Sequence, residues 1–169
     1  SYAEGILSYD ETRCSGCGIC LIACPNKARG LQPGQITAFQ RRVAESAAAI
    51  VKTLNKKIIY MNFLMDIVPQ YYRFAWADTP FVPDIGILAS TDPVAIDTFS
   101  MELIKWTAGI PKTAAEDAGA LAKGVEKFKA LTGADPEVML SHAESLGLGS
   151  KDYQVLISEV TAFWQRNGN

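Results

Sequence analysis

The sequence predicts an α/β fold with a partial open, mostly parallel sheet and covering helices. Two apolar runs, Ile58–Met65 and Ile85–Ala89, are interrupted only by Asn62, and such runs are typical of strands buried on both faces in a parallel sheet. Helix start signals precede and follow them, and 169 residues suffice to bury one core. We therefore expect an α/β domain over residues 35–169 and a distinct segment over residues 1–34.

A helix with one buried face is predicted before the strands. Thr37 followed by Gln40 is a capping-box pattern at a helix start, and residues 27–34, which include two glycines and a proline, are expected to form the preceding loop. Apolar residues then recur at spacings of three and four, which places them on one side of a helix. These residues are Ile36, Phe39, Val43, Ala47, Ile50, Val51 and Leu54.

Three further helices are predicted after the strands. Two dipeptides, Asp92-Pro93 and Asp135-Pro136, place a capping Asp before a proline at the first helical position. A third start is the capping box of Thr113 and Glu116. We expect helices from Asp92 to about Trp106, from Thr113 to about Leu131 and from Asp135 to about Leu146. A third strand is expected at Tyr153–Ser158.

All four cysteines lie close together near the N-terminus. They form the run Cys14-x2-Cys17-x2-Cys20-x3-Cys24-Pro25, the spacing with which bacterial-type ferredoxins hold a 4Fe–4S cluster. Zinc sites usually separate their cysteine pairs by about a dozen residues, and so closely spaced cysteines rarely form disulfides in a non-secreted chain. The four cysteines are therefore the predicted metal-binding and cofactor-binding residues, and residues 1–34 the predicted ferredoxin-type 4Fe–4S segment.

A single run of cysteines leaves the sharing of ligands open. In two-cluster ferredoxins the fourth cysteine of a run ligates the other cluster. By that rule Cys14, Cys17 and Cys20 hold one cluster without its fourth ligand, and Cys24 serves a second cluster. Either the four cysteines share one cluster in an unusual arrangement, or a second run lies upstream of Ser1 or on a partner. The absence of an initiating Met favours a fragment of a longer chain.

Charge and hydropathy exclude several classes of protein. The chain has 16 Lys and Arg against 18 Asp and Glu, a formal net charge of −2, which argues against a nucleic-acid partner. No apolar run approaches the roughly 18 residues that a membrane helix requires, and residues 1–7 carry no basic region typical of a signal peptide. We expect a cytoplasmic protein without a membrane partner.

Several segments resemble a known family. The stretch Val82-Pro-Asp-Ile-Gly-Ile-Leu-Ala-Ser-Thr-Asp-Pro-Val-Ala-Ile-Asp97, preceded by Asn62-Phe-Leu-Met-Asp66, resembles the iron-sulfur protein family catalogued as domain of unknown function 362. The resemblance extends to His142-Ala-Glu-Ser-Leu-Gly-Leu-Gly149. It implies that the chain corresponds to the C-terminal half of a larger unit with an α/β N-terminal part and two ferredoxin-type runs, of which the run seen here is the second.

The chain departs from the family pattern at one place. Many relatives carry a Cys-Asp-Cys element after the strand that matches Asn62–Asp66, whereas this chain reads Pro69-Gln-Tyr-Tyr-Arg73. No metal or redox role of that element is transferred to these residues. The resemblance identifies a class of protein and names no substrate.

Three carboxylates and one histidine are candidate functional residues. Asp66 follows the first predicted strand, and ligands of open α/β sheets bind beyond the carboxyl ends of strands. It is the weak catalytic candidate, and the alternative is the capping of a turn. Asp92 and Asp97 are suited to bind a cation or polarise a substrate, but an N-cap and the helix dipole already account for them. His142 shares a helical spacing with apolar neighbours and is expected to be a semi-buried packing residue.

The predicted loop Val68–Pro83 is unusually aromatic. So many rings do not suit a freely solvated connection. The loop either covers the core of its own domain or forms a wall for a flavin, a substrate or the missing N-terminal half, and we favour the interface with that half. Its aromatic residues are Tyr71, Tyr72, Phe74, Trp76 and Phe81.

Three functional hypotheses follow. The first is a ferredoxin-like electron-transfer or redox module whose partner is the missing N-terminal half or a redox protein. The second is a structural cluster in a binding or cofactor- and metal-assembly module, without electron transfer. The third is part of an oxidoreductase whose active site lies between two halves and uses Asp66 and the aromatic loop.

Overall fold

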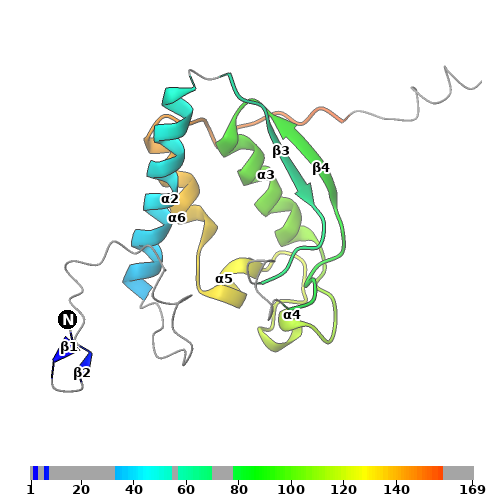
Figure 1. Ribbon diagram of the computed structural model, residues 1–169. Helices are drawn as coiled ribbons and strands as arrows, with labels where there is room; N and C mark the ends of the chain where they lie inside the picture. The colour runs from blue at the N-terminus through cyan, green and yellow to red at the C-terminus, as the bar shows by residue number, and fades with distance from the viewer. Residues whose placement is uncertain (1, 4–5, 8–32, 55–56, 70–77, 158–169) are drawn as a thin grey trace, which may run out of the picture.

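The computed structural model describes residues 2–3, 6–7, 33–54, 57–69 and 78–157 (Figure 1). The four cysteines and most of the predicted segment 1–34 lie outside these residues. The described part is a mixed α/β structure in which helix α3 lies between the β3–β4 sheet and the helix pair α2 and α6 (Figure 1). The elements are β1 (Tyr2–Ala3), β2 (Ile6–Leu7), α2 (Pro33–Thr53), β3 (Tyr60–Leu64), β4 (Gly86–Ser90), α3 (Pro93–Trp106), α4 (Ala114–Asp117), α5 (Lys127–Thr132) and α6 (Pro136–Ser145).

The sheets are antiparallel, so the prediction of a mostly parallel sheet is wrong. β1 pairs with β2, and β3 pairs with β4 in a register that runs from Tyr60 opposite Ser90 to Leu64 opposite Gly86. The apolar runs indicated strands, but a run that is apolar on both faces does not specify the direction of pairing. Antiparallel strands require only a connection that reverses the chain, whereas parallel strands require a crossover.

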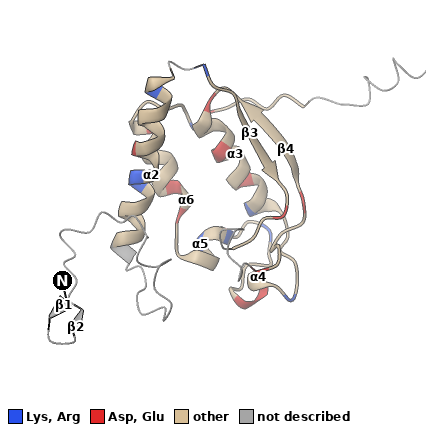
Figure 2. Cartoon of the chain, viewed as in Figure 1, with Lys and Arg blue, Asp and Glu red and all other residues tan. Residues whose placement is uncertain are grey.

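Within the described part of the chain, one face of the β3–β4 sheet is covered and the other is exposed. Side chains alternate along a strand, and Leu64 points toward the core. On the opposite face Met61, Phe63 and Ile87 are exposed, with 59% of Phe63 accessible to solvent. Strands β3 and β4 carry no charged side chain (Figure 2). The expectation that both faces are buried is therefore correct for the face against α3 and wrong for the other.

Helix α2 begins earlier and buries a different face than predicted. It starts at Pro33, because proline is compatible with the first turn of a helix. The residues that it buries are Gln40, Ala44 and Ala48, whose spacing of four places them on one stripe. The small alanines suit a close approach to α6, the element with which α2 makes its main contacts. Most of the larger apolar residues of the predicted stripe, such as Ile50, are exposed.

The capping residues of α3 and α6 are confirmed. Asp92 accepts hydrogen bonds from the N–H groups of Val94 and Ala95 at 2.8 and 2.9 Å. Asp135 accepts one from the N–H group of Glu137 at 3.1 Å. Both aspartates precede a proline at the start of the helix, so these starts follow directly from local sequence.

Two predicted elements differ from the structure. The helix expected from Thr113 to about Leu131 is divided into α4 and α5, because Gly119 and Gly124 between them adopt positive φ angles of 67° and 85° that a right-handed helix does not contain. The strand expected at Tyr153–Ser158 is not formed over the described residues 153–157, which lie outside any regular element.

The main core lies where β3, α3 and the segments before β4 meet. Phe81 and Val82 are fully buried with Ile104 and Ala115. The ring of Phe81 meets the ring of Phe128 edge to face, with centroids 5.4 Å apart, a favourable aromatic geometry. Phe81, which is the one aromatic residue of the predicted loop that lies within the described residues, therefore belongs to the core of its own domain.

Candidate functional site

The predicted cluster ligands lie outside the described residues. The candidate site within the described residues is formed by polar side chains. Among the described residues, no group of three or more His, Cys, Asp or Glu gathers in a way that would hold a metal ion. The predicted role of Cys14, Cys17, Cys20 and Cys24 therefore remains a prediction.

A polar cluster joins β3 to α3. The side-chain amide of Asn62 donates hydrogen bonds from Nδ2 to Asp97 Oδ1 at 2.7 Å and to Ser100 Oγ at 2.9 Å. Ser100 in turn donates its hydroxyl to the carbonyl of Ile96 at 2.7 Å. Asn62 is the polar interruption of the apolar strand, and it points to α3 because its neighbours along β3 face the other way. The two hydrogens of its Nδ2 atom are both used.

Asp97 is a carboxylate in a largely apolar setting. Desolvation by burial raises the pKa of its carboxyl above the usual 3.8, and the hydrogen bond from Asn62 partly opposes this shift. Within the described part of the chain, Asn62 supplies the one hydrogen bond that reaches this carboxylate. Asp97 therefore connects α3 to β3 through Asn62, in addition to the favourable interaction with the helix dipole that its position in the sequence suggested.

Asp97 lines a hollow between α2, α3 and α6, which we call the Asp97 hollow. Its volume is about 170 Å³. Apart from Asp97, the described residues that line it are apolar and come from all three helices and the turn after α6. They include Ala44, Ala47, Val94, Met139, Leu140 and Leu148. Val43 lies at the rim with 41% of its surface exposed. The Asp97 hollow therefore combines one acidic group with a hydrocarbon lining.

A second hollow adjoins the first at the start of α3. It has a volume of about 270 Å³, shares Pro93 and Leu148 with the Asp97 hollow, and is lined also by Tyr60 and Asp92. Asp92 is fully engaged here, because its Oδ2 accepts a hydrogen bond from the N–H group of Ser150 at 2.9 Å in addition to the two capping bonds. Asp92 is therefore a structural residue that ties the chain after α6 to α3.

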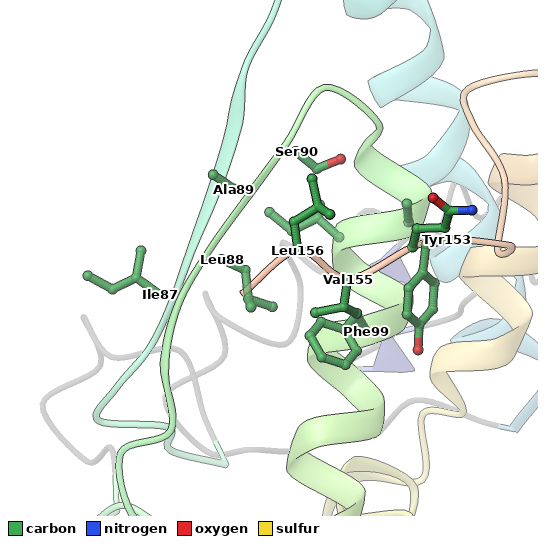
Figure 3. A pocket seen from close by; sticks show the side chains of 11 residues that line it. Ile87, Leu88, Ala89, Ser90, Phe99, Tyr153, Val155 and Leu156 are labelled. Atoms are coloured by element: carbon green, nitrogen blue, oxygen red, sulfur yellow. The ribbon is translucent and has the colours of Figure 1, made fainter. Parts of the chain in front are cut away.

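A third hollow separates β4 from the C-terminal segment 152–157. Figure 3 shows Tyr153, Val155 and Leu156 beside Phe99 and the side chains of β4. Tyr153 anchors this segment, since its hydroxyl donates to Glu102 Oε2 at 2.5 Å and its ring lies 5.2 Å from that of Phe99. Burial and the Glu102 carboxylate raise the pKa of Tyr153 to about 12. The segment predicted as a third strand is therefore separated from β4 by this hollow.

Asp66 lies apart from the polar cluster. It lies two residues after the end of β3, has a left-handed backbone with φ 48°, and donates its N–H group to Asp84 Oδ1 at 3.0 Å. Its side chain is exposed. A left-handed backbone is uncommon for a residue other than glycine and is most frequent in Asn and Asp. The carboxylate that accepts a backbone N–H group in this turn is that of Asp84, so both the turn-capping role and the catalytic role of Asp66 remain predictions.

His142 joins two helices. It is semi-buried as expected, with 25% of its side chain exposed, and its Nε2 lies 3.1 Å from Glu45 Oε1 on α2. This contact links α6 to α2, the helix pair with the most extensive contacts among the described helices. His142 lies outside the Asp97 hollow and is a packing residue of the helix pair.

Some residues of the site had no signal in the sequence. A single serine within a predicted helix does not indicate a functional site. The hydrogen bond between Ser100 and Asn62 depends on how α3 crosses β3. Gly149 lies so close to Asp92 that a Cβ atom there would be 1.9 Å from Oδ1. The Gly147-Leu-Gly149 pattern marked the end of a helix, but it did not indicate which side chain Gly149 meets.

No described helix has the length and apolarity that crossing a bilayer requires. The profile of the family described as Domain of unknown function (DUF362) matches residues 11–102. This range covers the cysteine run, the Asn62 strand, β4 and most of α3. No curated protein and no solved structure matches.

Proposed function

The chain belongs to the family described as Domain of unknown function (DUF362), and from this premise we propose that it is a 4Fe–4S cluster-binding protein that acts as a ferredoxin-like electron-transfer or redox module. The observation that carries the proposal is the run of Cys14, Cys17, Cys20 and Cys24. Four thiolates at this spacing are the donor set that iron–sulfur clusters require. The run also lies inside the matched range.

The cysteines would hold the cluster, and the neighbouring backbone would tune it. Gly16 and Gly18 lack side chains, so backbone N–H groups near them are free to approach the cluster sulfides, and such hydrogen bonds affect the reduction potential. When bound, the cluster would accept or donate one electron at a time. We place the protein in the cytoplasm, where reducing conditions preserve thiolates.

The partner we propose is a polypeptide with a second cysteine run or a redox protein. If Cys24 serves a different cluster from Cys14, Cys17 and Cys20, each cluster needs ligands from elsewhere. A longer parent chain or a separate subunit would supply them. Electrons would then pass between two neighbouring clusters.

The test is the content of iron and acid-labile sulfide per chain after anaerobic reconstitution. It is measured separately for the 169-residue chain and for a longer parent chain. About four of each in the 169-residue chain means that the four cysteines complete one cluster. None here but about eight in the parent means shared ligands. Both results support cluster binding. Absence of iron, and of an absorbance band near roughly 400 nm that bleaches with dithionite, in both preparations would overturn it.

A matched pair of variants assigns the ligands. Cys17→Ser should remove the iron, because serine is a poor substitute for a soft thiolate ligand. Ser15→Ala changes the same loop without touching a ligand and should retain the iron. Equal iron content in the two variants would contradict the assignment of Cys17.

A second candidate function is a structural cluster in a binding or cofactor- and metal-assembly module. The exposed apolar face of β3–β4, with Phe63 at its centre, favours it, because such faces often mark interaction sites. In this case the cluster resists reduction, while chelation of iron unfolds the chain. Reversible reduction without loss of secondary structure would exclude this alternative.

A further inference from the structure

The Asp97 hollow presents an electrostatic problem that the described residues do not solve. Asp97 receives one hydrogen bond from the described residues, and the described residues that line the hollow include no Lys, Arg or His. Desolvated carboxylates are costly unless they are paired with a cation and hydrogen-bonded. Asn62 has no further hydrogen to give, because its Nδ2 also serves Ser100.

The remaining walls favour a hydrocarbon group. Ala47, Val94, Leu140 and Leu148 line the space, and burial of apolar ligand surface against such side chains is favourable by about 25 cal/mol per Å². An apolar cavity of roughly 150 Å³ is known to hold a six-carbon ring, so about 170 Å³ admits a ligand of similar size. The exposed rim at Val43 provides access from the surface of α2.

We infer that the Asp97 hollow binds a small organic ammonium ion, with Asp97 as the counter-ion and the apolar walls of α2, α3 and α6 around its alkyl group. The adjoining hollow, which begins at Pro93 and Leu148 and extends to Tyr60, gives room for a longer alkyl substituent. The inference is independent of the cysteine run, since it uses only residues of the α/β domain.

Two probes of equal size separate the charge from the shape. 3-Methylbutylammonium chloride and the neutral 3-methylbutanol differ at one terminal group. Their dissociation constants for the full 169-residue chain are measured by ligand-observed NMR titration at neutral pH. We expect at least tenfold tighter binding of the ammonium ion. Equal affinity would mean an apolar hollow only, and the absence of saturable binding of both would mean no site. Either result overturns the inference.

Three variants place the binding in the hollow. Asp97→Asn should weaken ammonium binding at least tenfold and leave alcohol binding unchanged, whereas Asp117→Asn, the same change at an exposed position on α4, should alter neither. Ala47→Leu keeps the carboxylate but fills the space, so it should abolish binding of both probes. Circular dichroism checks folding. If Asp97→Asn does not fold, the two probes and Ala47→Leu still decide. Unchanged ammonium binding in a folded Asp97→Asn or Ala47→Leu would contradict the inference.

Discussion

Asp92 shows how one side chain carries several structural tasks. It caps α3 with two hydrogen bonds, and a third fixes the N–H group of Ser150. Loss of an N-cap costs about 0.5–2 kcal/mol, and the bond to Ser150 adds to this cost. The carboxylate is therefore held in place by three donors and has little freedom to move.

We predict that Gly149→Ala destabilises the chain strongly and does so through Asp92. The new Cβ would lie 1.9 Å from Asp92 Oδ1, so the carboxylate would have to give up hydrogen bonds worth about 1 kcal/mol each. In an Asp92→Ala background the obstacle is absent. The free energy of unfolding, from urea denaturation of the four chains of a double-mutant cycle, should reveal a coupling of about 0.5–3 kcal/mol. Additive effects would contradict this prediction.

Asp97 should make stability decrease as the pH rises. Burial raises its pKa above 3.8 in the folded chain, so the folded state binds the proton more tightly than the unfolded state. Its contribution is fully present below pH 3.8 and is lost as the pH rises through the folded pKa. We expect Asp97→Asn to lose this dependence. The free energy of unfolding of the variant minus that of the wild type should therefore be larger at pH 7 than at pH 4, as measured by urea denaturation at both pH values.

The comparison must be made as a difference between chains. The pKa values of Asp135 and Glu137 are lowered, mainly by hydrogen bonds from Lys129 and Lys151, and these groups lose stability as the pH falls. Because they titrate equally in both chains, their effect cancels in the difference. A difference between wild type and Asp97→Asn that does not vary with pH would disprove the prediction, and Asp117→Asn serves as the control.

At the scale of elements, a buried lysine donates a hydrogen bond to a carbonyl group in the last turn of α3. Lys127 is fully buried, and its ammonium group donates to the carbonyls of Lys105 and Ala122 at 3.1 and 3.3 Å. Burial lowers the pKa of Lys127, while nearby Glu126 acts in the opposite direction. One side chain thus connects α5 to the last turn of α3 and to the turn between α4 and α5.

Replacement of this lysine should loosen that connection. Lys127→Met keeps the apolar stem but removes the donor, which leaves two carbonyl groups without this partner and should cost about 1–3 kcal/mol of unfolding free energy. Lys129→Met, on the same helix, removes an exposed ion pair with Asp135 and should cost less than about 1 kcal/mol. Urea denaturation gives both values. A larger loss for Lys129→Met would refute the proposed role of Lys127.

Local signals predicted the helix starts well and the relations between elements poorly. Asp92 and Asp135 cap helices because side chain and backbone within three residues decide the geometry. The pairing direction of β3 depends on a partner more than twenty residues away, and the buried face of α2 depends on α6 accepting Ala44 and Ala48 in preference to the larger Phe39 and Ile50. In the candidate site, Asn62 and Asp97 were noticed separately. Their contact required the crossing of α3 over β3.

At the scale of the whole molecule, one face of the β3–β4 sheet presents exposed apolar side chains among the described residues. Met61, Phe63, Met65 and Ile87 are all exposed and together form an apolar patch. Contiguous exposed apolar patches often mark sites of interaction. The face should bind hydrophobic dyes and promote self-association at high concentration.

A polar replacement on this face should reduce both effects. We predict that Phe63→Thr lowers the fluorescence of bound 1-anilinonaphthalene-8-sulfonate and the weight-average mass from light scattering, with little change in stability, because threonine suits a strand. Ile50→Thr removes a similarly exposed residue from α2 and should have a smaller effect. Equal effects of the two changes would show that the sheet face is not special.

The bond between Ser150 and Asp92 also bears on the order in which the chain folds. The two residues are 58 positions apart, so the third donor of Asp92 arrives only after the segment between them has closed into a loop, and closure of such a loop is entropically costly. During synthesis α3 can form with the two local capping hydrogen bonds of Asp92 as soon as it emerges. All three hydrogen bonds of Asp92 are present only after α6, Gly149 and Ser150 have been synthesised, so the segment after α6 completes the start of a helix that forms earlier.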